Sequence, residues 1–175
     1  MKRLRQISAL AVMLMFVLGM HARAQQVTKA QLSKAWDDMT TMVVGTAKAM
    51  PAEHYSWSPA EGIAYFGRLV SHQIQANYGF APAIFGLEKP ANPPTWDDEV
   101  KDDVVKTMEA SFKYIKDGID KMTQADLDEQ VEVFGNTTSR LRAVLILTAH
   151  LQREHGKAIT YVRIKGVTPA GSGGW

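Results

Sequence analysis

Three side chains in this sequence have the types and spacing of a metal site. His150 and Glu154 are four residues apart in the long apolar segment Leu141–Lys165. Residues four apart on a helix project from the same face, one turn above the other, so both could bind one ion. His72, in a second apolar segment far upstream, is the third candidate. Ligands from two helices of a bundle commonly converge on a metal.

His155 directly follows Glu154 and is an alternative ligand. At about 100° per residue, Glu154 lies about 40° around the helix from His150, whereas His155 lies about 140° away. His155 therefore falls on the side of Leu141 and Leu145, unless a local bulge turns it inward. The metal-ligand hypothesis leaves the choice of third ligand open and comprises His72, His150, Glu154 and His155.

Two histidines and one carboxylate would leave coordination positions open for water or substrate. Zinc is the expected divalent ion, with nickel, iron or manganese as alternatives. The ion would act as a Lewis acid or lower the pKa of a bound water. Glu154 is then the candidate catalytic residue, as a general base in place of a ligand. The competing interpretation is an i,i+4 polar pair of His150 and Glu154 in a degenerate site.

Residues 1–24 have the pattern of a secretory signal peptide. A basic start precedes the apolar run Ile7–Met20, and Ala22–Ala24 is a cleavage motif. The run has about 14 residues, short of the roughly 20 that span a bilayer, so we expect no stable membrane anchor. Cleavage after Ala24 would place the mature protein in the periplasm or outside the cell.

Composition narrows the classes of partner. The first 24 residues contain four of the 20 basic residues and none of the 18 acidic residues. The mature chain therefore carries 16 basic and 18 acidic side chains, a net charge of −2. No basic stripe remains for a nucleic-acid partner. The sequence has no cysteine, which excludes a thiolate ligand or nucleophile.

Four apolar segments with helical spacing must position these residues. The first begins at Thr28, where Gln31 completes a capping box, and ends at Pro51. The second begins at Ser58, includes Ile63 in its buried stripe and ends near Gly79.

The third helix is expected to begin at Thr95, with acidic residues 97–99 in its first turn, and to end near Lys121. The fourth begins at Thr138 or Ser139 and ends at Gly166. Between these two helices, residues 130–134 have an extended pattern. The chain is predicted to be all-α, with one four-helix bundle over residues 25–169 and a flexible tail over 170–175.

Several motifs resemble the DinB/YfiT-like family, in the family's order along nearly the whole mature chain. They are Met50–Glu53, Pro59–Gly62, Phe66–His72, Ala76–Tyr78 and His150–Pro169. The resemblance implies a bundle of up-down-down-up topology and supports His72 as a ligand. The chain departs from the family pattern where Glu154 takes the place of a second histidine and Lys157 that of a glutamine.

The resemblance implies one of three reactions on an unidentified small-molecule substrate: hydrolysis, thiol transfer or isomerisation. Low-molecular-weight thiols are mainly cytosolic, so an exported protein favours metal-dependent hydrolysis. The alternative function is a non-catalytic binding module with a degenerate metal site. Family members often pair through helix faces, so a homodimer is also expected by resemblance.

Overall fold

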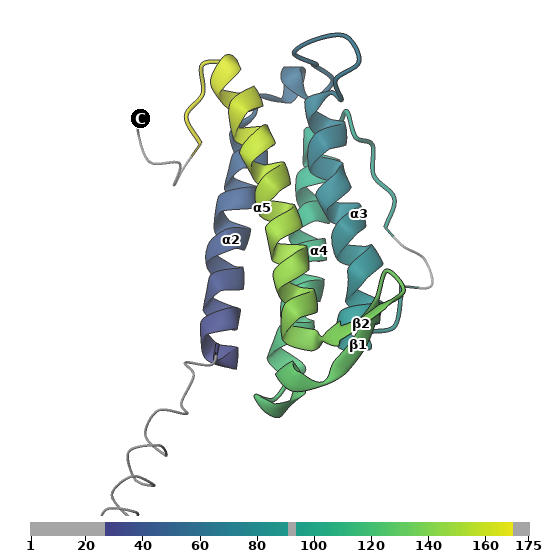
Figure 1. Ribbon diagram of the computed structural model, residues 1–175. Helices are drawn as coiled ribbons and strands as arrows, with labels where there is room; N and C mark the ends of the chain where they lie inside the picture. The colour runs from purple at the N-terminus through teal and green to yellow at the C-terminus, as the bar shows by residue number, and fades with distance from the viewer. Residues whose placement is uncertain (1–26, 91–93, 170–175) are drawn as a thin grey trace, which may run out of the picture.

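Four long helices dominate the computed structural model, which describes residues 27–90 and 94–169 (Figure 1). They are α2 (Lys29–Ala49), α3 (Phe66–Phe85), α4 (Lys101–Lys121) and α5 (Arg140–Ile164). Short 3-10 turns, η1 (Ala52–His54) and η2 (Ala125–Asp128), and a hairpin of β1 (Gln130–Val133) and β2 (Asn136–Ser139) connect them. The predicted four helices are confirmed, whereas the signal peptide and the tail lie outside the described residues.

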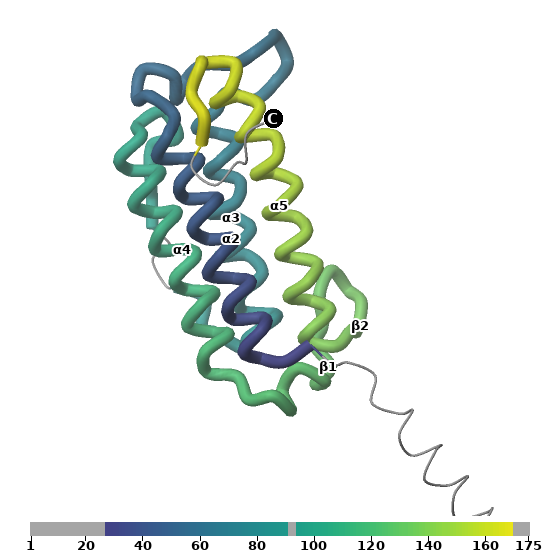
Figure 2. The backbone as a smooth tube through the Cα atoms, turned by 90° about the vertical axis from the view of Figure 1, so that its left-hand side faces the viewer, coloured from purple at the N-terminus to yellow at the C-terminus, as the bar shows by residue number. Residues whose placement is uncertain are grey.

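The helices run in two directions. Trp36 donates its indole N–H to the Phe112 carbonyl, and nearer the other end of α2 Lys48 pairs with Glu109, so α2 and α4 are antiparallel. Figures 1 and 2 show α5 alongside α2 in the same direction, and α3 alongside α4 in the other. Residues 94–100 run back along the bundle before α4 begins, so that α3 and α4 are parallel neighbours (Figure 1).

The core lies between the four helices. Its buried apolar side chains come from every helix and from the turn after α2; they include Trp36, Tyr55, Phe66, Met108, Phe112 and Leu147. Each contributes about 1.5–3 kcal/mol by leaving water. Among the described residues, no helix is both long and apolar enough to cross a membrane.

The helix ends that carry their own capping side chains lie where the sequence predicted them. Thr28 and Gln31 form the capping box of α2, and Pro51 follows its last residues. Ser139 accepts a hydrogen bond from the backbone N–H of Arg142 at the start of α5. The chain leaves α5 at Gly166, whose φ of 75° suits a residue without a Cβ.

The predicted start of the second helix at Ser58 is wrong, because α3 begins at Phe66. The Ser58 hydroxyl donates to the carbonyls of Ala60 and Ile63, so it stabilises a turn in place of a helix cap. Gly62 then has a φ of 76°, outside the helical region. Ile63, expected in the core, is 50% exposed.

The predicted end of this helix at Gly79 is also wrong, because α3 continues through Pro82 to Phe85. A proline inside a helix removes one backbone hydrogen bond. Ala81 and Ile84 are fully buried on either side of it, and their burial favours the extra turn.

The third helix begins at Lys101, six residues later than Thr95, where it was predicted. The acidic residues 97–99 lie in the loop before the helix and not in its first turn. Asp98 accepts a hydrogen bond of 2.6 Å from the Trp96 indole, which also lies 2.9 Å from the Ser71 hydroxyl on α3. This contact fastens the incoming loop to α3.

A β-hairpin stands where only an extended segment was predicted. β1 pairs with β2 in antiparallel register, from Gln130 opposite Ser139 to Val133 opposite Asn136. The two intervening residues, Phe134 and Gly135, have φ values of 54° and 70°, the pattern of a type I′ turn. The hairpin lies beside the C-terminal end of α3 (Figure 1).

Candidate ligand groove between α3 and α5

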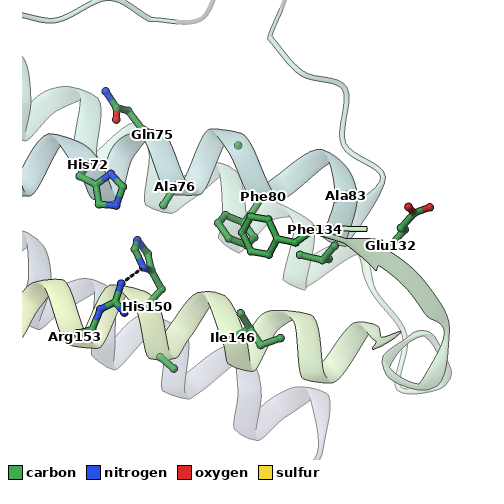
Figure 3. Close-up of a pocket in the computed structure, with 13 residues that line it drawn as sticks. His72, Gln75, Ala76, Phe80, Ala83, Glu132, Phe134, Ile146, His150 and Arg153 are labelled. Carbon is green, nitrogen blue, oxygen red and sulfur yellow. Dashed lines mark hydrogen bonds between the residues drawn. The ribbon is translucent and has the colours of Figure 1, made fainter. Parts of the chain in front are cut away.

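His72 on α3 and His150 on α5 face each other across the two antiparallel helices. Their ring centroids are 5.0 Å apart and the rings meet edge to face, at 79°. His72 is exposed and His150 is half-buried. Figure 3 shows both rings directed into the space between the helices. The structure therefore brings together two of the predicted histidines, His72 and His150, from different helices.

The histidine pair lies at one end of a groove of about 870 Å³ between α3, α5 and β1. We call this end, with His72, Gln75, His150 and Arg153, the polar end (Figure 3). The other end, which we call the apolar end, is lined by Phe80, Ala83, Phe134 and Ile146.

Arg153 determines which nitrogen of His150 carries the proton. One Nη of Arg153 lies 3.1 Å from Nδ1 of His150 (Figure 3). A guanidinium has only donors, so Nδ1 accepts and the neutral ring carries its hydrogen on Nε2. Burial lowers the pKa of His150, and the nearby His72 ring lowers it further. His150 is therefore neutral at pH 7 and directs an N–H donor into the groove.

Glu154 is held by two cations. Only 3% of it is exposed, and its carboxylate accepts hydrogen bonds from Lys157 at 2.8 and 3.0 Å and from Nε of Arg153 at 3.1 Å. Burial on its own would raise the pKa of Glu154, but the hydrogen bonds from Lys157 and Arg153 outweigh it and keep the pKa low. Glu154 is therefore ionised, with both oxygens engaged.

His155 lies on another side of α5 and belongs to the core. Its Nε2 is 2.9 Å from the Thr46 hydroxyl of α2, and the ring also bonds to the backbone of Met42. Burial lowers the pKa of His155, so the ring is neutral. The residue joins α5 to α2 and takes no part in the groove.

Three of the four predicted metal ligands, His150, Glu154 and His155, have other partners in this arrangement. Both ring nitrogens of His150 and of His155, and both oxygens of Glu154, already have partners or a proton. Across residues 27–90 and 94–169, no group of three or more His, Cys, Asp or Glu side chains is placed to hold a metal. Lys157 and Arg153 supply the positive charge that an ion would bring to Glu154. Metal binding thus stays a prediction.

Several residues that shape the rest of the groove were not predicted from the sequence. Arg153 and Gln75 complete the polar end, and Phe80 and Phe134 form an edge-to-face pair at 4.9 Å in the apolar end. The Phe134–Gly135 dipeptide after an alternating segment could have indicated the hairpin that carries Phe134, because glycine is typical of a two-residue hairpin connection.

Comparisons with known proteins agree on the fold. Residues 31–158 match the sequence profile of the DinB superfamily. The crystal structure of a DinB-like protein from Bacillus subtilis is 20% identical, with a TM-score of 0.65 over 78% of this chain and 92% of that one. A DinB-like protein from Bacillus cereus is 17% identical, with a TM-score of 0.71 over 83% and 98%. At these identities the similarity shows the fold alone. No curated protein matches the chain.

Proposed function

The chain belongs to the DinB superfamily, and we propose that it is a ligand-binding protein whose groove between α3 and α5 holds a small molecule. The groove itself carries the proposal. Its volume of about 870 Å³ lies within the range of small-molecule sites, which are mostly apolar with a few well-placed polar groups. The polar end supplies those groups, and the apolar end supplies the contact area.

The polar end presents hydrogen-bond donors in a fixed arrangement. Nε2–H of His150 is directed into the groove, and Arg153 keeps donors beyond those engaged by His150 and Glu154. The Gln75 amide lies along the same wall. A ligand with acceptor atoms would be oriented here before its apolar part fills the rest of the groove.

Filling the groove with a large side chain tests the proposal. Ala149 is an exposed residue of α5 that lines the groove, and Ala149→Trp would occupy the groove while every polar residue keeps its identity. Gln152→Trp places the same side chain on α5 outside the groove lining and serves as the matched control. The neutral fluorescent probe N-phenyl-1-naphthylamine should bind the parent and the control at one site per chain. Ala149→Trp should weaken binding more than tenfold; equal binding by all three would contradict the proposal.

A divalent ion is the rival occupant of the polar end. The ring separation of 5.0 Å suits two zinc–nitrogen bonds of about 2.0–2.1 Å, although Arg153 would have to leave His150 first. Metal analysis of the purified mature protein decides between a small molecule and a divalent ion as the occupant. We expect well below one zinc per chain. One zinc per chain, lost in His72→Ala and His150→Ala, would favour the metal site and reopen metal-dependent hydrolysis.

Export is a further proposal, supported by the signal-peptide pattern in residues 1–24. N-terminal sequencing of protein from the periplasm or medium should begin at Gln25. Material that begins at Met1 in the membrane fraction would instead indicate an uncleaved anchor.

A further inference from the structure

We propose that the ligand of the groove is an amphipathic monocarboxylate, with its carboxylate at the polar end and an unbranched apolar chain that ends against Phe134. This inference rests on the proposed function and names the class of molecule that the groove takes. Two independent features lead to it: the backbone conformation of Phe134 and the charge balance of the polar end.

Phe134 occupies a turn position that does not suit phenylalanine. Its φ of 54° lies in the left-handed region, where side chains other than Asn, Asp and Gly are rare. A type I′ turn favours Asn-Gly, and here the turn is Phe134–Gly135. Phe134 is 76% exposed, and its ring forms an edge-to-face pair with the Phe80 ring at 4.9 Å. A strained, exposed aromatic at the mouth of a groove indicates a ligand contact.

The polar end favours an anion. Arg153 and Lys157 bring two positive charges against the single negative charge of Glu154, which leaves one in excess. Glu132, an acidic residue of the groove lining, lies at the far end beside the hairpin (Figure 3). A carboxylate would accept hydrogen bonds from Arg153 and from Nε2–H of His150, and both would be charge-assisted.

The groove extends along α3 between these two features. His72 and Phe80 are eight residues apart on α3, which separates the polar and apolar ends by about 12 Å along the helix. Ala76 and Gly79 lie between them on the groove wall. Such small side chains leave room for a linear chain, and decanoate is a suitable probe.

Phe134→Asn separates a role in ligand contact from a role in folding. The variant creates the favoured turn, so the melting temperature should rise by about 2–4 °C. Decanoate affinity should fall about tenfold, because the chain loses its aromatic end wall. A structural residue would not give these opposite signs. Unchanged affinity in a folded Phe134→Asn protein would overturn the assignment.

Comparison of decanoate with 1-decanol tests the anion. Titration calorimetry of the full mature chain should give at least tenfold tighter binding for decanoate. Arg153→Gln keeps a hydrogen-bond donor but removes the charge, and should abolish that difference by weakening decanoate binding more than decanol binding. Arg163→Gln, an exposed arginine of α5 away from the groove lining, is the control and should bind both ligands as the parent does.

The outcomes distinguish this inference from the proposed function. Equal affinity for decanol and decanoate, with loss of both in Ala149→Trp, would overturn the carboxylate assignment and leave a ligand groove. Failure of every probe, with no effect of Ala149→Trp, would overturn both. Sedimentation that shows a dimer dissociating in Phe134→Asn would identify a second copy of the chain as the occupant, and would also overturn the inference.

Discussion

Arg153 and Lys157 both contact Glu154, and Arg153 also donates to Nδ1 of His150. A guanidinium cannot accept a hydrogen bond, so Nδ1 of His150 and the Glu154 carboxylate must be the acceptors. These atoms then use the lone pairs that a metal would need. His72 and His150 were predictable as neighbours from helical spacing and family resemblance. The hydrogen bond between Arg153 and His150 was not predictable, because it depends on which rotamer a long cationic side chain adopts once the helices are packed.

Removal of the Arg153 and Lys157 side chains should make the predicted ligands His150 and Glu154 available to a metal. In Arg153→Ala/Lys157→Gln, His150 can adopt the other tautomer and Glu154 regains two unpaired oxygens, so zinc affinity should rise at least tenfold over the parent. Competition with a fluorescent zinc chelator measures the change. The same double variant with His150→Ala is the control and should lose the gain. Equal zinc affinity in the parent and double variant would show that the cations do not block the site.

His155 makes stability depend on pH. Burial lowers its pKa in the folded protein, so the unfolded chain binds the proton more readily. Stability is therefore fully present above the unfolded pKa of about 6.5 and falls as the pH drops toward the folded value. Between pH 7.5 and 5.5 the free energy of unfolding should decrease by about 1 kcal/mol from this group. Urea unfolding at both values should show a smaller decrease in His155→Gln; an equal decrease would exclude His155 as the source.

At the scale of elements, the accuracy of the prediction depended on where the hydrogen-bond partners of each helix end lie. Thr28 and Ser139 cap their own helices, so local sequence revealed both starts. The N–H groups of Phe66 and Gly67 donate instead to the carbonyls of Trp57 and Tyr55. These partners are set by the tertiary course of the preceding loop, which periodicity cannot detect.

Gly67 is where α3 meets two loops, and a side chain there should disrupt the element. A Cβ at this position would collide with the backbone carbonyl of Asp98 and come within 3.2 Å of that of Tyr55. Gly67→Ala should therefore destabilise the fold by about 2–4 kcal/mol. Gly156→Ala is the matched control, since a Cβ there meets nothing within 4 Å and should stabilise α5 by about 0.5–1 kcal/mol. Thermal unfolding compares them; an intact Gly67→Ala protein would contradict the close approach.

At the scale of the whole molecule, the bundle has an apolar core drawn from all four helices, and the charge of Glu154 is balanced by Lys157 and Arg153. Removal of metal should therefore leave its stability unchanged. Thermal unfolding with and without EDTA should give melting temperatures within about 1 °C of each other, because a ligand that does not bind the folded state cannot stabilise it. A fall of about 5 °C or more in EDTA would show that a bound ion contributes to folding.

The helical class, the single bundle and its four helices were accessible from apolar spacing, because each helix buries one continuous stripe. The groove was not, because it depends on a hairpin whose second strand, Asn136–Ser139, is polar and short. The role of the exposed, positive-φ Phe134 in the groove becomes apparent only when β1 is placed beside α3.

The protonation state of His150 tests the central claim most directly. Nitrogen-detected NMR of the mature protein at pH 7.5, with equimolar zinc added, should show the hydrogen on Nε2 and an unprotonated Nδ1 that accepts from Arg153. The spectrum should not change on addition of zinc. A hydrogen on Nδ1, with the Nε2 signals of His150 and His72 both shifted by zinc, would contradict the account and restore the metal site.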